Sequence, residues 1–245
     1  MTGMLAVFRR ELSGYFATPV ATVFIVAFLL LASIATFYVG GLLERGQADL
    51  RPFFQVHPWL YVVLMPAIAM RLWAEERRSG TIELLLTLPV GLGSVVVGKF
   101  LAAWAFTAAA LALTVPVWLT VNYLGHPDNG VVLAGYAGSL LMAGGDLAVC
   151  ACLSALTRNQ VVAFVLGVVA CLLLTMAGSP IVLDAVAGWA PRALIEAVAG
   201  FSVLTRFAAI IDGVIDLRDV VFFASLIALA LFANMLVVDL RKGAG

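Results

Sequence analysis

The chain has 245 residues, of which 64% are hydrophobic and only 11% are charged. A soluble domain is typically about half apolar and about a quarter charged, so this composition excludes an ordinary soluble protein and favours a membrane protein. Fourteen basic residues balance fourteen acidic residues, and this net charge of zero gives no indication of nucleic acid or an acidic polymer as partner.

Residues 3–16 carry too many charges to cross a membrane, but their apolar residues recur at helical spacing. The apolar stripe consists of Leu5, Phe8, Leu12 and Phe16. Arg9, Arg10 and Ser13 fall outside this stripe. The pattern predicts an amphipathic helix that lies in the membrane interface.

Six apolar runs are candidates for membrane spans, each of which needs about 20 mostly apolar residues. The predicted spans are 19–41, 58–73, 100–124, 131–156, 161–178 and 220–238. Thr18 and Pro19 are typical of a helix start, as the N-cap and the first helical residue. Pro66 and Pro116 lie inside spans and predict kinks. The sequence therefore predicts an all-α integral membrane protein with a single transmembrane domain over residues 1–245.

Lys and Arg residues are distributed unevenly between the two sides of this topology. With six spans both termini share one side, and that side carries nine Lys or Arg residues against five on the other. The positive-inside rule then places both termini in the cytoplasm. The expected location is the bacterial inner (cytoplasmic) membrane.

Residues 74–90, AEERRSGTIELLLTLPV, follow the second span on the predicted cytoplasmic side. Ser79 and Gly80 interrupt the helix, and a new helix of about two turns is expected over 81–88 before Pro89 ends it. Leaving its aliphatic side chains in water would forfeit on the order of 10 kcal/mol. These side chains are Ile82, Leu84, Leu85, Leu86 and Leu88. Either the protein's own bundle and lipid or a groove on a soluble partner protein must cover them, and hydropathy alone does not separate the two.

Residues 93–100, GSVVVGKF, contain G-x-x-x-x-G-K, which is one residue short of a phosphate-binding loop. Phe100 stands where that loop needs a Ser or Thr hydroxyl for magnesium, and a membrane span follows directly. We therefore expect no nucleotide, metal or other cofactor in this chain. The glycines are expected to let the chain re-enter the bilayer, with Lys99 anchoring the third span at the cytoplasmic headgroups.

Residues 179–219 form the predicted outer segment, which is too long for a turn. Neither of its apolar pieces is long enough, or free enough of charge, to cross the membrane twice. We expect two short helices that dip into the outer leaflet or cap the bundle, and an extra hairpin is the alternative.

Polar residues inside the spans are few. Asp146 lies in the fourth span, where a carboxylate costs about 2.5–3.5 kcal/mol, so it either marks a transport pathway or makes a structural hydrogen bond. The cysteines at 150, 152 and 171 lie in apolar runs and are expected in helix packing rather than at a metal. His57 and His126 neighbour prolines and are expected in loops.

The cytoplasmic sequence RLWAEERRSGTIELLLTLPVGLGSVVVGKFLA resembles the signature of type-2 ABC exporter permeases, E-E-R-x-x-G-T-[IL]-E-x-L-L-x-x-P followed by G-K. Three further stretches resemble the GldF-like branch, the gliding-motility-associated permease subunits. They are Arg9–Ala21, Ser154–Gln160 and Gly213–Phe232. The match departs at Asp146 and over 179–212.

The resemblance implies the permease subunit of an ATP-driven transporter. Two permease copies would form a dimer with two separate cytoplasmic ATPase subunits, which bind ATP and Mg. The chain itself would be non-catalytic, and a periplasmic or membrane-anchored accessory protein is a further expected partner. A secondary transporter or a membrane-embedded lipid-processing protein without an ATPase is the alternative. The sequence identifies neither the substrate nor whether the dimer joins identical chains.

The resemblance also assigns roles to three groups of residues. Helix 3–16 would be the connecting helix, which contacts the ATPase through Phe8, Arg9, Arg10 and Leu12. Helix 81–88 would be the coupling helix, with a site composed of Glu75, Glu76, Arg77, Arg78, Gly80, Thr81, Ile82, Glu83, Leu84, Leu85, Leu86 and Pro89. A second cytoplasmic contact would consist of Thr157, Arg158, Asn159 and Gln160.

Overall fold

The computed structural model describes residues 2–42, 44, 46, 48–81, 90–179, 182–184, 191 and 200–241. Every regular element in these residues is a helix, which confirms the predicted all-α fold class. The elements are α1 (Thr2–Phe16), α2 (Pro19–Ile34) with its π-helical continuation (Ala35–Val39), α3 (Arg51–Ser79), α5 (Leu92–Ala112), α6 (Val115–Leu124), α7 (Asn129–Ser154), α8 (Gln160–Met176), α11 (Val203–Ile211) and α12 (Leu217–Leu240).

Five helical stretches are long and apolar enough to cross a membrane. They are Ala21–Tyr38, Arg51–Ser79, Leu92–Leu124, Asn129–Ser154 and Leu217–Leu240. The predicted fifth span corresponds to α8, an apolar helix of 17 residues. At about 1.5 Å per residue this helix is shorter than the hydrocarbon core, which is about 30 Å thick.

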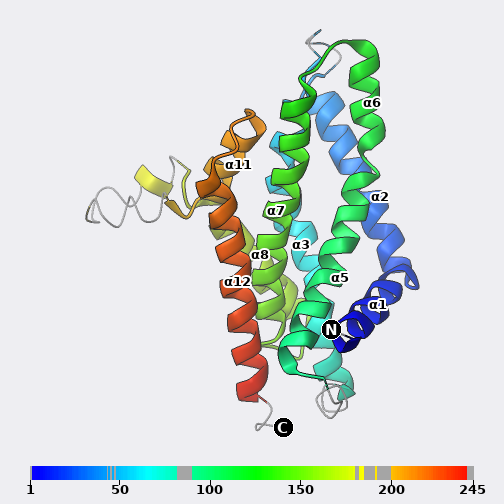
Figure 1. Cartoon of the computed structure of the whole chain (residues 1–245), viewed down its shortest axis with the longest axis vertical. Coiled ribbons are helices and arrows are strands. Elements are labelled where there is room, and N and C mark those ends of the chain that lie inside the picture. The colour runs from blue at the N-terminus through cyan, green and yellow to red at the C-terminus, as the bar shows by residue number, and fades with distance from the viewer. Residues whose placement is uncertain are drawn as a thin grey trace.

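The long helices form an elongated bundle, and α1 lies across one end of it (Figure 1). The C-terminal end of α12 lies at this same end (Figure 1). The end of α3 and the start of α5 also lie there, and we call this region the α1 end of the bundle. The chain between α2 and α3 and the turn between α6 and α7 lie at the opposite end.

Helix α7 is central, because it packs against α3, α5, α8, α11 and α12. Its glycines serve these contacts. A Cβ at Gly135 would lie 2.5 Å from the Phe54 ring of α3, and one at Gly138 would lie 2.6 Å from Ile210 of α11. The close approach of backbones that these glycines permit is therefore used inside the bundle.

Helix α3 begins at Arg51, seven residues before the predicted span, and incorporates both Pro58 and Pro66. The expectation that His57 is a loop residue was wrong. His57 lies inside α3 with its side chain fully buried, and its Nδ1 is 2.7 Å from the Ser139 hydroxyl of α7. The Tyr61 hydroxyl, one turn along α3, is 2.7 Å from the same oxygen.

The predicted third span is two helices in sequence rather than one. Helix α5 starts at Leu92 and ends at Ala112, and α6 begins at Val115. Pro116 stands in the first turn of α6, and the Thr114 hydroxyl donates to the Leu111 carbonyl at the junction. A proline disfavours helical conformation before it and removes a backbone donor, which explains the break.

Part of the outer segment is the short amphipathic helix α11. Ser202 caps its N-terminus by accepting a hydrogen bond from the Thr205 amide. The buried face carries Val203, Phe207, Ile210 and Ile211 and packs against α3, α7 and α8. This helix therefore packs on the bundle through its apolar face, whereas most of residues 180–199 of the predicted outer segment lie outside the described residues.

Candidate functional site

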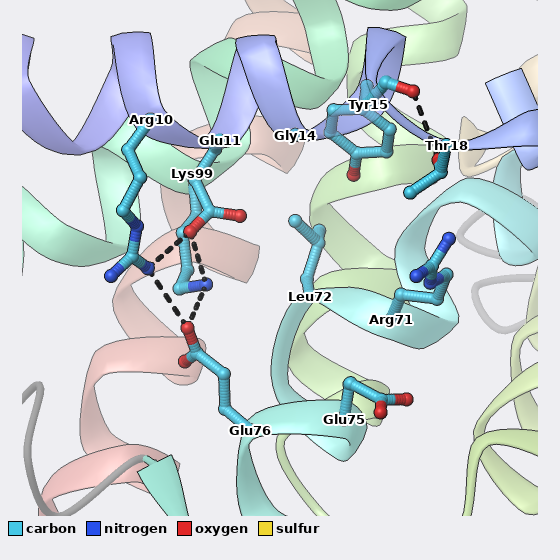
Figure 2. Close-up of a pocket in the computed structure, with 10 residues that line it drawn as sticks. All are labelled: Arg10, Glu11, Gly14, Tyr15, Thr18, Arg71, Leu72, Glu75, Glu76 and Lys99. Carbon is cyan, nitrogen blue, oxygen red and sulfur yellow. Dashed lines mark hydrogen bonds and ion pairs between the residues drawn. The ribbon is translucent and has the colours of Figure 1, made fainter. Parts of the chain in front are cut away.

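The α1 end contains four ion-paired side chains from three segments that are distant in sequence. The Lys99 ammonium of α5 lies 3.1 Å from Glu11 Oε1 of α1 and 2.8 Å from Glu76 Oε1 of α3. The Arg10 guanidinium contacts the same two oxygens at 2.5 and 3.1 Å. Figure 2 shows these four side chains converging between the helices, and we call them the ion-pair cluster.

Burial differs sharply within the ion-pair cluster. The Lys99 side chain is 2% exposed, whereas that of Arg10 is 54% exposed. A buried ammonium is costly unless it is paired and hydrogen-bonded. Two carboxylates offset that cost here, and the Trp73 ring adds a cation–π contact at 5.3 Å from its centroid. The expectation that Lys99 anchors its helix at the headgroups was therefore wrong.

Glu11 is the acidic residue of α1 that enters the cluster. Burial acts to raise the pKa of its carboxyl, but the charge of Lys99 and the hydrogen bond from Arg10 outweigh burial and hold that pKa below its ordinary value. The carboxylate is therefore ionised at neutral pH, and it remains a strong acceptor for both cations.

Helix α1 rests on α5 at Gly98, the residue before Lys99. A Cβ at this position would lie 3.1 Å from both the Met4 carbonyl oxygen and the Val7 Cβ. The G-K pair that mimics a phosphate loop thus has two structural roles. The glycine permits close helix packing, and the lysine pairs with the helix that packs there.

The far end of α1 is fixed by aromatic contacts. The Tyr15 ring stacks on Phe106 of α5 with centroids 5.1 Å apart, and Phe16 meets the same ring edge-on at 5.5 Å. The predicted apolar stripe is only partly buried, since Leu5 is 46% exposed and Phe16 57% exposed. The buried aliphatic residue of this helix is instead Val7.

A cavity of about 360 Å³ opens between α1, α3 and α5 beside the ion-pair cluster. The cluster borders one side of it, and Arg71 and Glu75 of α3 border another (Figure 2). Tyr15 also lines this cavity and donates to the Ile68 carbonyl at 3.5 Å. Burial raises the pKa of the Tyr15 hydroxyl, so this side chain is a neutral donor.

The predicted coupling residues before the short helix lie at the α1 end. Glu75 and Arg77 are half-buried, Arg78 is exposed, and Gly80 ends α3 in the left-handed conformation with φ of 72°. The Thr81 hydroxyl is 2.9 Å from that of Ser79. The remaining predicted coupling residues, Ile82, Glu83, Leu84, Leu85, Leu86 and Pro89, lie outside the described residues.

The residues predicted for the second contact form the turn between α7 and α8. Asn159 caps α8 by accepting from the Val161 amide, and the Thr157 hydroxyl accepts from the Asn159 amide. Gln160 is the first residue of α8, and Arg158 is exposed. The Arg241 guanidinium donates to the Leu156 carbonyl at 2.5 Å, which ties the end of α12 to this turn.

Asp146 lies in α7, away from the α1 end, and is 1% exposed. The Cys171 sulfur of α8 interacts with its carboxylate and is 3.4 Å from the sulfur of Cys150. Its Oδ1 has no partner among the described residues. The two roles suggested for Asp146, on a transport pathway or in a structural hydrogen bond, stay predictions.

Sequence reasoning missed the participation of Glu11 and Lys99. The sequence feature that could have indicated these ion pairs is the scarcity of charge. Only 11% of residues are charged, and charged residues near membrane spans need partners. No local sequence pattern identifies the ion pairs of Lys99, because this residue lies 88 residues from Glu11 and 23 from Glu76.

Comparison with known families adds an independent observation. The chain matches the family described as ABC-2 family transporter protein over residues 58–193, which is more than half of its length. The match includes Glu76 and Lys99 of the ion-pair cluster, whereas α1 precedes it. No curated protein matches the chain. Members of this family are typically non-catalytic membrane subunits that work with a separate ATPase. This chain therefore belongs to the ABC-2 family of transporter proteins, as a multi-pass permease subunit of an ABC transporter.

Proposed function

We propose that this chain couples ATP hydrolysis by a separate cytoplasmic ATPase subunit to export or mechanical work across the membrane. The α1 end of the bundle would be the docking surface for that subunit. Two permease copies and two ATPase copies would form the working transporter, with ATP and Mg bound only by the ATPases. Both termini would then lie in the cytoplasm of a bacterium, at its inner membrane.

The observation that carries this proposal is the ion-pair cluster, because it joins both flanks of the predicted coupling helix to α1. Glu76 lies five residues before Thr81, at the end of α3, and Lys99 lies early in α5. A Cβ at Gly3 of α1 would lie 3.0 Å from the side chain of Val90, two residues after the predicted coupling helix. A displacement of residues 81–88 would therefore be transmitted to three helices at once.

The side chains that α1 leaves uncovered support a partner at this end. Arg9 is exposed, and Leu5 and Phe16 are also largely exposed in the isolated chain. In our proposal α1 is the connecting helix, with Arg9 directed at the ATPase and the apolar residues shared with lipid. Glu75 and Arg78 would contribute to a polar border around the coupling helix, which sets docking orientation more than affinity.

The turn 157–160 would be the smaller second contact. Asn159 and Thr157 already have structural roles within the turn, so Arg158 and Gln160 are the side chains with capacity for a partner. The GldF-like branch, a homodimeric or heterodimeric arrangement and an accessory protein outside the cytoplasm are further parts of the proposal.

Co-purification tests this function. Glu83→Arg and Leu85→Asp are each expected to weaken association with the ATPase about tenfold or more, because a buried leucine contributes about 1.5–3 kcal/mol. The matched control is Glu44→Arg, which makes the same charge change at an exposed residue between α2 and α3. The measurement is the amount of ATPase, co-expressed with the tagged chain, that is recovered in mild detergent.

Unchanged recovery in both coupling variants would remove the basis for placing the ATPase at residues 81–88. Equal loss in Glu44→Arg would show a general effect of charge rather than a docking surface. Recovery of the wild-type chain with no ATPase at all would instead favour a secondary transporter or a lipid-processing protein.

A further inference from the structure

A second group of charged residues at the α1 end differs from the ion-pair cluster in having one sign. Arg77 is in the last turn of α3, Arg158 is in the turn between α7 and α8, and Arg241 follows α12. The Arg241 guanidinium donates to the Leu156 carbonyl, two residues before Arg158, and the Ala74 amide, one turn before Arg77, donates to the Ser154 hydroxyl at the end of α7. The ends of α3 and α12 therefore meet the same turn, where the positive charges of Arg241 and Arg158 act on the Arg77 guanidinium. We call these three residues the arginine triplet.

The arginine triplet is short of negative partners. None of its three members is in an ion pair with a residue in the described part of the chain. Arg77 Nε is buried and has no hydrogen-bond acceptor among those residues. Asp239 lies two residues before Arg241 and has an interaction of its own. Like charges gathered in this way favour an anion between them.

Apolar side chains next to the arginine triplet are exposed. Leu240, directly before Arg241, is 79% exposed, and Leu236 one turn earlier is 48% exposed. Val161, three residues after Arg158, is 67% exposed. A ligand that suits both features carries a negative charge at one end and hydrocarbon next to it. The position at the ends of membrane-spanning helices is where phospholipid headgroups lie.

We propose that the arginine triplet binds the phosphate of an anionic phospholipid, whose acyl chains lie along the exposed residues of α12 and α8. Bound lipid would neutralise the repulsion among the three guanidiniums and supply an acceptor near Arg77. It would also connect α3, the α7–α8 turn and α12 at the membrane surface. Arg77 and Arg158 also belong to the ATPase surface proposed above, so the lipid titration is carried out without the ATPase and tests the lipid site by itself.

The test is a lipid titration of the full chain, purified in dodecylmaltoside, with the thermal midpoint of unfolding as the readout. Dioleoylphosphatidylglycerol is expected to raise the midpoint, because a ligand that binds the folded state stabilises it. Arg77→Gln/Arg158→Gln is expected to need about 30-fold more of this lipid for the same shift, at about fivefold for each basic residue. The matched control is Arg218→Gln, at an exposed residue at the opposite end of α12, which should respond like the wild type.

Arg158→Gln alone keeps the test valid if the double variant does not fold, because Arg158 is exposed and no hydrogen bond is recorded for its side chain within the described residues. It should need about fivefold more lipid. Dioleoylphosphatidylcholine and inorganic phosphate should each leave the midpoint unchanged. An equal shift with phosphatidylcholine would indicate general solvation by lipid, and one with phosphate would indicate a site for a free anion. Either result would overturn the proposal.

Two other outcomes would also overturn the proposal. In one, the arginine variants titrate like the wild type. In the other, Arg158→Gln leaves the lipid titration unchanged but reduces co-purification of the ATPase, which would assign the arginine triplet to the partner protein. Failure of the coupling-helix variants to affect ATPase recovery would test only the proposed function and would leave the lipid result intact.

Discussion

Lys99→Met is expected to lower the free energy of unfolding by about 3–5 kcal/mol, whereas Arg10→Met should lower it by less than about 1 kcal/mol. The two cations contact the same oxygens of Glu11 and Glu76, so the chemistry of the pairs is nearly the same. Burial makes the difference, since Lys99 is 2% exposed and Arg10 is 54% exposed. Removing Lys99 leaves two mostly buried carboxylates with only a solvated partner.

The measurement is equilibrium unfolding of the purified chain in detergent, with Arg10→Met as the matched control from the same cluster. A second variant, Lys99→Met/Glu76→Gln, removes one carboxylate along with the ammonium and should recover part of the loss, because less uncompensated charge remains. Equal losses for Lys99→Met and Arg10→Met would contradict the importance of burial. A loss below about 1 kcal/mol for Lys99→Met would show that the buried pair contributes no more than a surface one.

Gly98→Leu is expected to destabilise the packing of α1 on α5 by about 1–3 kcal/mol. The first added carbon would already meet the Met4 carbonyl oxygen and the Val7 Cβ at 3.1 Å. Neither atom belongs to the flexible end of a side chain, so the leucine fits only if α1 moves away. That movement would also separate Glu11 from Lys99, so the effect extends beyond the contact itself.

Hydrogen exchange of the α1 amides measures this effect, because exchange there reports local opening. The substitution at Gly98 should accelerate exchange about 5- to 150-fold, which corresponds to a loss of about 1–3 kcal/mol because the opening equilibrium depends exponentially on free energy. Gly14→Leu is the matched control, since a Cβ at Gly14 has no neighbour within 4 Å. Slower or unchanged exchange in Gly98→Leu would show that α1 is not seated on this glycine.

Hydropathy alone predicted the positions of the long helices, because membrane spans need long apolar runs and this chain has few interruptions. Hydropathy missed the first turns of α3, because the polar residues Arg51 and Gln55 stand among the apolar ones there. Helix α3 includes these residues, with Pro52 in its first turn and Pro58 within the helix. The proline next to His57 predicted a loop. The residue that contacts the buried His57 side chain is Ser139 of α7, which is distant in sequence and could not be identified from the residues around His57.

The candidate site was predictable as a region but not as a set of contacts. The resemblance directed attention to Glu76 and to the helix at residues 3–16, and both lie at the α1 end. The roles of Gly98 and Lys99 depend on α1 folding back onto α5, which is a tertiary event without a local pattern. The stripe prediction for α1 failed in part for the same reason, since the helix rests on Val7 while Leu5 and Phe16 remain largely exposed.

The central claim is that the α1 end is where the ATPase docks, and site-specific photo-crosslinking tests it most directly. A benzoylphenylalanine would replace Leu85 of the predicted coupling helix, Arg9 of α1, or Tyr123, which is 91% exposed at the C-terminal end of α6. With the ATPase co-expressed, we predict a covalent adduct to it from positions 85 and 9 and none from position 123. An adduct from position 123 without one from the other two positions would contradict the claim.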